Sequence, residues 1–277
     1  MEITLAPERL FLLEERLTLD EIQQRAMDKR TSALGSLLQR PKPEEVTLVN
    51  KQRRLEPFWH VAGHATYVYE RNREYSVPAA AADVEALTIN GTRYEGQAAG
   101  QSRAFRVPAR EHCRTEIKSE AFVDGLTGAP VPEGPQIING PRSEIADPAS
   151  LATDDTIAVP PENRASYVVR ALMGEIMKPV QADTVLEELV VLEATDLFYR
   201  PIWAFEFTWA GKGKQAIVEI DAVTGQTRAG KALVGQIKGM LNRDLLFDVG
   251  ADTVGLIVPG GSIAVKLAKA AIDKNKK

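Results

Sequence analysis

The sequence has a single cysteine, three histidines and no long hydrophobic run. Because Cys113 is alone, neither a disulfide nor a cysteine-based metal cluster can form within the chain. The start, Met1-Glu2-Ile3, lacks the basic residues and apolar stretch of a secretory signal. The longest charge-free stretch near the C-terminus, residues 253–265, is too short to span a bilayer. We therefore expect a cytoplasmic protein.

Familiar catalytic motifs are also missing. The sequence contains no Gly-x-Ser-x-Gly, His-Glu-x-x-His or P-loop phrase. His112 and Cys113 are adjacent, and neighbouring side chains on a strand point to opposite faces, so they make a poor nucleophile–base pair. We expect a protein that needs no cofactor and is not an enzyme.

The charge pattern argues against a nucleic-acid partner. The chain has a net charge of −4, with 44% hydrophobic and 26% charged residues, as is usual for soluble globular proteins. Residues 231–277 carry eight basic against four acidic residues, a net charge of +4, so the rest of the chain stands at −8. Because an acidic body repels a polyanion, we expect no binding of nucleic acid.

Two phrases occur twice in the same order. Pro57-Phe58-Trp59 and a later Asp-x-x-Thr-Gly phrase form the first copy, and Pro201-Ile202-Trp203 with a second Asp-x-x-Thr-Gly form the other. In such a phrase the carboxylate can accept backbone N–H groups of a turn, and glycine takes a left-handed conformation without steric cost. We interpret both phrases as strand-closing turns of a duplicated sheet module. The turn-forming residues are Asp124, Thr127, Gly128, Asp221, Thr224 and Gly225.

The two copies differ in length. Asp124 lies 67 residues after Pro57, whereas Asp221 lies 20 residues after Pro201. Within the longer copy, Asn90-Gly91 predicts a hairpin with a type I′ turn. Residues 71–74 are expected to form another turn, with a return strand at 75–77. Because this copy also holds every histidine and the only cysteine, a specific site is expected there.

Domain boundaries follow from helix signals and proline. Thr18-Leu19-Asp20-Glu21 fits a capping box, and Pro41-Lys42-Pro43 ends the helical pattern. These signals predict a helical N-terminal arm at 1–44 and a first sheet module with its insertion at 45–130. A linker rich in proline and glycine follows at 131–160, and the second module occupies 161–230.

The second copy resembles a known family. A helix precedes two antiparallel strands, and the last strand ends in Val218-Glu219-Ile220-Asp221-Ala222-Val223-Thr224-Gly225, as in the C-terminal half of a PepSY domain. The resemblance covers about residues 161–229 and, in a more divergent copy, 55–129. It implies a non-enzymatic module with a binding or inhibitory role, often beside peptidases or on envelope proteins. This chain departs from the pattern by its long insertion and by the missing export signal.

The histidines support an alternative, a metal-dependent enzyme centred on His60, His64 and His112. Residues four apart on a strand lie about 13 Å apart, whereas zinc binds its ligands at about 2.0–2.3 Å. One ion could join His60 to His64 only if the strand were broken at Gly63. Otherwise the three are hydrogen-bonded or exposed histidines of a sheet.

The C-terminal residues predict amphipathic helices. Apolar residues share one stripe of a helix at 233–245, and a second helix at 262–274 is apolar over most of its circumference. Such a helix packs on its own body, docks a partner protein, or lies on a membrane surface, where Lys274, Lys276 and Lys277 would meet anionic lipid.

The sequence thus predicts an α+β fold of two duplicated antiparallel-sheet modules with helices packed on one face, plus helical N- and C-terminal arms (1–44 and 231–277). We expect a non-enzymatic binding or regulatory protein that assembles with a protein partner or with itself through its terminal helices. The alternatives are the metal-dependent enzyme and a peripheral membrane protein held by the basic tail. The candidate ligand-facing residues are the aromatic ones, Trp59, Tyr67, Tyr69, Trp203, Phe205 and Trp209.

Overall fold

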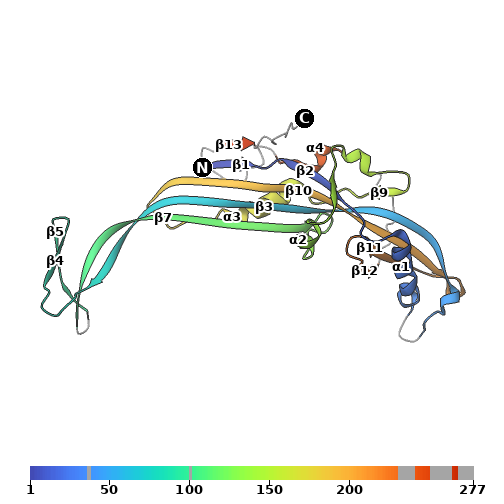
Figure 1. Ribbon diagram of the computed structural model, residues 1–277, viewed down its shortest axis with the longest axis horizontal. Coiled ribbons are helices and arrows are strands. Elements are labelled where there is room, and N and C mark those ends of the chain that lie inside the picture. The colour runs from blue at the N-terminus through green and yellow to red at the C-terminus, as the bar shows by residue number, and fades with distance from the viewer. Residues whose placement is uncertain (36–38, 100–101, 230–240, 250–263, 268–277) are drawn as a thin grey trace, which may run out of the picture.

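The computed structural model describes residues 1–35, 39–99, 102–229, 241–249 and 264–267. Its framework is one large mixed sheet with the strand order β12-β11-β10-β3-β7-β6 (Figure 1). These strands are β3 (Val46–Pro78), β6 (Gln97–Ala99), β7 (Ser102–Asp124), β10 (Thr184–Trp209), β11 (Lys214–Asp221) and β12 (Thr227–Ala229). The predicted α+β fold with helical arms is therefore wrong, because strands dominate the described chain.

The long strands β3 and β10 form the axis of the sheet. They pair antiparallel from Val46 opposite Trp209 to Glu70 opposite Thr184. The two Pro-x-Trp phrases lie close together midway along this ladder, where Pro57 is opposite Tyr199 and Pro201 is opposite Leu55. The first copy continues by pairing β3 with β7, and the second by pairing β10 with β11. The copies therefore form two halves of one sheet, related by an approximate two-fold axis.

The beginning of the chain is extended and does not form a helical arm. β1 (Glu2–Leu5) and β2 (Glu8–Leu13) run parallel to β10 and pair with it. Ile3, Leu10 and Leu13 are buried there. Pairing with a buried strand overrides the helix propensity of this leucine- and glutamate-rich segment.

Two helices cover the sheet. α1 (Leu19–Leu34) begins with the predicted capping box of Thr18 and Glu21, which is confirmed. α3 (Ala165–Ile176) buries Val168, Leu172 and Ile176. Each helix packs on the other copy's hairpin: α1 precedes β3 but lies on β10 and β11, and α3 precedes β10 but lies on β3 and β7 (Figure 1). The two copies are thus interlocked by an exchange of helices.

Two short segments of the predicted linker pair with the sheet. β8 (Arg142–Glu144) pairs with β2, and β9 (Thr156–Ala158) pairs with β3. The short helices of the described chain are η1 (Pro43–Glu45), α2 (Gly134–Ile137), η2 (Pro148–Leu151), η3 (Ala210–Lys212) and α4 (Arg243–Leu246).

The C-terminal prediction is corrected where residues are described. β13 (Ala264–Leu267) pairs in parallel with β1, so the helix predicted at 262–274 is wrong at these positions. Leu241, Leu246 and Phe247 are buried in the main core under α3. Of the helix predicted at 233–245, residues 243–245 belong to the short helix α4 and 241–242 are not helical. Residues 233–240, 262–263 and 268–274 of the two predicted helices lie outside the described residues.

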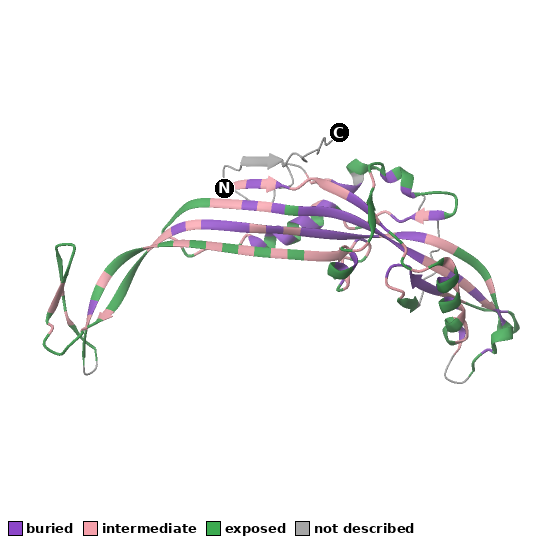
Figure 2. Ribbon diagram, viewed as in Figure 1, coloured by how far each residue is buried: buried purple, intermediate pink, exposed green. Residues whose placement is uncertain are grey.

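Figure 2 shows where burial stops along the sheet. The centre of β3 and β10 is buried, whereas β3 beyond residue 70 and the start of β7 are largely exposed. This exposed end corresponds to the insertion that distinguishes the first copy from the second.

Candidate functional site: the arm and the free edge of β7

The insertion forms a projecting two-stranded ribbon. Glu70 is the last residue of β3 that pairs with β10, whereas β3 pairs with β7 as far as Pro78. We call residues 70–112 the arm; β4 (Ala86–Ile89) and β5 (Thr92–Glu95) lie at its end (Figure 1). The turn predicted at 71–74 and the return strand at 75–77 are wrong, because β3 continues straight through them.

The tip of the arm contains a fully buried side chain. Phe105 is fully buried although it lies far from the main sheet centre. Backbone hydrogen bonds from Ala79 N to the Arg103 carbonyl (2.8 Å) and from Gly96 N to the Glu85 carbonyl (2.9 Å) close the tip. The Asn90-Gly91 turn is confirmed, with φ angles of 47° and 81°. The tip is thus a defined structure at the end of the ribbon.

Cross-strand ion pairs hold the ribbon together. Glu111 accepts hydrogen bonds from Arg71 and from the Tyr75 hydroxyl, and these two bonds lower the pKa of its carboxyl group. Arg106 binds Glu74 at 2.7 Å. The ribbon is therefore fastened by side chains where β10 no longer supports it.

One edge of β7 is free over a long stretch. The Phe122 carbonyl accepts from Val131 N, and Asp124 N donates to the Ala129 carbonyl, so both residues point their backbone groups away from β3. The β3–β7 ladder keeps one register throughout, so every even-numbered residue of β7 points the same way. Between residues 105 and 120, no strand among the described residues pairs with this edge. Its N–H and C=O groups can accept another strand.

The even-numbered side chains along this edge are mostly charged, and their signs alternate from Arg114 to Glu120. From the arm toward the body, the exposed even-numbered residues between 106 and 120 are Arg106, Pro108, Arg110, His112, Arg114, Glu116, Lys118 and Glu120. Pro108 lacks an N–H, and its missing donor falls on the free side, where proline is tolerated in a sheet. Arg114 makes no ion pair within the described part of the chain.

The three histidines lie on one sheet face but each has its own partners. His64 Nδ1 lies 2.7 Å from Glu193, and His112 Nδ1 lies 3.1 Å from Glu70. Among the described residues, no group of three histidine, cysteine or acidic side chains is placed to hold a metal ion.

His60 is the most enclosed of them. Its Nδ1 lies 3.4 Å from Asp196 and its Nε2 lies 2.8 Å from Glu120, and the ring stacks on Phe122. Arg9 binds the same Asp196 carboxylate through two hydrogen bonds of 2.8 and 2.9 Å. The arrangement joins β2, β10, β3 and β7 by hydrogen bonds, so it serves the sheet's cohesion.

The charge of His60 makes stability depend on pH. Burial acts to lower the pKa of the imidazole, and the hydrogen bonds to Asp196 and Glu120 outweigh it, so the pKa is raised. The stabilisation is therefore complete below the unfolded pKa of about 6.5 and is lost as the pH rises through the folded pKa. We expect His60→Gln to cost more unfolding free energy at about pH 6 than at about pH 9. Urea titrations measure this, and a cost that grows with pH would contradict it.

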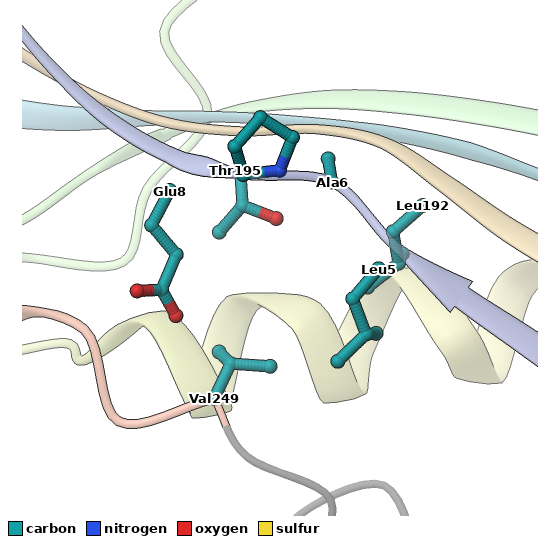
Figure 3. Close-up of a pocket in the computed structure, with 7 residues that line it drawn as sticks. Leu5, Ala6, Glu8, Leu192, Thr195 and Val249 are labelled. Atoms are coloured by element: carbon teal, nitrogen blue, oxygen red, sulfur yellow. The ribbon is translucent and has the colours of Figure 1, made fainter. Parts of the chain in front are cut away.

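A small cavity opens beside β10 (Figure 3). β1 pairs with β10 as far as Thr4, and β2 pairs with it again from Glu8. The pairing is interrupted because Pro7 has no N–H to donate and because β10 has a register shift between Leu192 and Ala194. The cavity has a volume of about 280 Å³ and is lined by Leu5, Ala6, Pro7, Glu8, Leu192, Thr195 and Val249. Burial raises the pKa of Glu8, opposed by Arg243 and reinforced by Asp248. Glu8 and Thr195 supply the polar side chains of this lining, which are too few to define a ligand class.

The predicted aromatic residues do not form a common surface. Trp59, Tyr67 and Tyr69 are buried in the main core under α3. Phe205 and Trp209 are buried in the core under α1, with Trp203 half-buried beside them. The structure therefore places the two sets in separate cores, and a ligand-facing role stays a prediction that it does not support.

The repeated turns have the predicted chemistry. Asp124 Oδ1 accepts from Leu126 N and Thr127 N, and Asp221 Oδ1 accepts from Val223 N and Thr224 N. In both turns the threonine hydroxyl accepts from the N–H two residues later. Gly128 and Gly225 have the same φ of 74°. The two phrases are thus structurally equivalent turns.

Sequence reasoning located the insertion but missed the free edge within it. The alternation of charged and small residues from Arg110 to Glu120, with a proline at 108, indicates a strand exposed on one face but does not show that its edge is unpaired. The comparisons add no further assignment, since no protein-family model, no curated protein and no solved structure matches this chain.

Proposed function

We propose that the chain is a non-enzymatic binding protein that engages a protein partner through the arm. The arm itself is the observation that carries the proposal. Residues 72–76 and 108–110 of the two strands are exposed, and Tyr75 and Ile89 expose 47% and 39% of their surface. A two-stranded ribbon gains little stability from its own contacts, so a long, ordered ribbon of this kind is suited to lie against another molecule.

The other sequence-based hypotheses have less support. The PepSY resemblance also implies a binding module, which agrees with this proposal. A partner contact through terminal helices is not retained, because α1 packs on β10 and β11 of its own chain and β13 interrupts the C-terminal helix. No helix in the described residues is long and apolar enough to cross a membrane. Association of the tail with a membrane surface stays a prediction, because most of its residues lie outside the described part.

Site-specific photo-crosslinking in cells tests the proposal. A photoreactive amino acid replaces Tyr75 or Ile89 on the arm, and in a control variant it replaces Tyr167, which is 59% exposed on α3. We expect both arm positions to give the same crosslinked protein, identified by mass spectrometry, and the Tyr167 variant not to give it. Adducts that are absent from the arm, or equal at all three positions, would refute a partner-binding arm.

A further inference from the structure

We infer that the free edge of β7 pairs antiparallel with β7 of a second copy of this chain, with Thr115 of each copy at the two-fold axis. This inference rests on the proposed function and names its partner. It follows from the length of the free edge, from the direction of its backbone groups and from the charges along it.

The boundaries of the free edge restrict the ladder. At the body end, Val123 is bridged to Pro130, and Phe122 is bonded to Val131, so a new strand cannot extend beyond about residue 120. At the arm end, Pro108 cannot donate a ladder hydrogen bond. Between these limits, segment 110–120 of one copy can pair along its whole length with segment 110–120 of the other. Its midpoint is Thr115.

The direction of the backbone groups agrees with this register. Hydrogen-bonded pairs in a new ladder must join residues whose N–H and C=O groups point outward, and on β7 these are the even-numbered ones. A two-fold axis at Thr115 pairs even with even: Arg114 with Glu116 of the second copy and Arg110 with Glu120 of the second copy. Thr115 then faces Thr115 of the second copy as a non-hydrogen-bonded pair, in which side chains approach most closely.

The charges select the same register. With the axis at Thr115, Arg114 meets Glu116 of the second copy, and each such pair occurs twice. Moving the axis by one residue would place Arg114 opposite itself or Glu116 opposite itself, and like charges directly opposite destabilise a sheet. Moving it two residues toward the arm brings Pro108 into the ladder. Moving it two residues toward the body shortens the ladder at the Val123–Pro130 bridge.

The remaining outward pair is His112 with Lys118 of the second copy. Each of these two side chains lies 3.1 Å from a carboxylate of its own chain, His112 from Glu70 and Lys118 from Glu116. Charged residues along an edge strand ordinarily deter foreign strands. Here the order of the charges places opposite charges across the axis when the strand pairs with a second copy of this chain, and it would still deter unrelated strands.

Engineered disulfides test the register. In a Cys113→Ser background, which contains no other cysteine, Thr115→Cys is expected to form a disulfide-linked dimer under mild oxidation. Cysteines at a non-hydrogen-bonded pair are within disulfide reach, with Cα atoms about 4.5 Å apart. Ser119→Cys in the same background is the matched control: it lies on the same face and strand, but opposite Glu111 of the second copy. Dimer from Thr115→Cys alone supports the register; equal crosslinking at both positions, or none at Thr115→Cys, overturns it.

Charge reversal tests the pairing without cysteine. Glu116→Arg places two arginines opposite each other and is expected to weaken dimerisation roughly tenfold in sedimentation equilibrium. Adding Arg114→Glu restores opposite charges across the axis and is expected to restore the dimer. Both positions are solvent-exposed, so folding is not at stake. A monomeric wild type, or a double variant as weak as the single, overturns the self-pairing. If the arm positions nevertheless crosslink another protein, the proposed function stands and only the identity of the partner is wrong.

Discussion

Replacing Gly63 by alanine is expected to lower the free energy of unfolding by about 2–3 kcal/mol. Gly63 lies in β3 opposite Leu192, next to the register shift in β10. A Cβ atom there would lie 2.6 Å from the carbonyl oxygen of Val191 and 3.3 Å from the Leu192 side chain. The closer atom belongs to the backbone of the paired strand, so it cannot withdraw without breaking the central ladder. Chemical denaturation monitored by circular dichroism measures the loss.

The same substitution at Gly174 is the matched control, with the opposite sign expected. Gly174 lies exposed within α3, and a Cβ atom there would meet nothing within 4 Å. Alanine is a better helix former than glycine by about 0.8–1.0 kcal/mol, so Gly174→Ala should stabilise the protein. If Gly63→Ala denatures at the wild-type urea concentration, the close approach of β3 to β10 is not essential to the sheet.

Gly63 also shows what sequence reasoning could reach. A break of the strand at Gly63 was the condition for one metal ion to join His60 to His64, and the structure has a register shift beside this glycine. The extra residue, however, is on the partner strand, where Glu193 falls between Leu192 and Ala194. A glycine within a strand can reveal that the backbone of a neighbouring strand approaches closely at that position. It cannot reveal which of the paired strands carries the bulge, because that depends on the register between residues more than 120 positions apart.

Features determined by local chemistry were predictable. The capping box at Thr18, the Asn90-Gly91 turn and the two Asp-x-x-Thr-Gly turns each depend on hydrogen bonds between residues a few positions apart. α3 was also predictable, since its apolar stripe gave a clear helical period.

Features determined by distant pairing were not predictable. β1 and β2 exist because β10 offers them an edge, and their composition alone resembles a helix. The arm was divided wrongly into a turn and a return strand, because a ribbon exposed on both faces shows no apolar alternation. The free edge of β7 is defined by what does not pair with it, which no local pattern can show.

The joining of the two copies concentrates charge inside the sheet. Arg54 and Glu219 are buried at 3% and 5% exposure, and Arg54 donates a hydrogen bond to Glu219 across the central strands. Arg228 also binds Glu219, at 2.6 Å, and Glu56 lies 3.8 Å from Arg54. This network lies near the approximate two-fold axis, where β3, β10 and β11 run side by side. It therefore links the two halves of the sheet through buried side chains.

Removing one partner of this network is expected to be strongly destabilising. Glu219→Leu leaves the buried Arg54 guanidinium without its nearest carboxylate, and an uncompensated buried charge costs about 3–5 kcal/mol. The loss should appear in urea denaturation as a lower midpoint with an unchanged slope, because the slope depends on the surface exposed on unfolding and the substitution leaves that surface nearly the same. Glu95→Ala is the control: it breaks an ion pair with Arg93 in which both side chains are mostly exposed, and it should leave the midpoint unchanged.

The double variant Arg54→Met/Glu219→Leu separates net stabilisation from the penalty of an unpaired charge. Replacing both partners by apolar side chains of similar size removes the buried charges together, and such replacements are often neutral or stabilising. We therefore expect the double variant to regain most of the stability lost by Glu219→Leu, since Arg228 keeps Glu56 as a partner. A double variant as unstable as the single would show instead that the Arg54–Glu219 hydrogen bond contributes net stability. The network would then hold the two halves of the sheet together by its own strength, and not merely because its charges cannot be left unpaired.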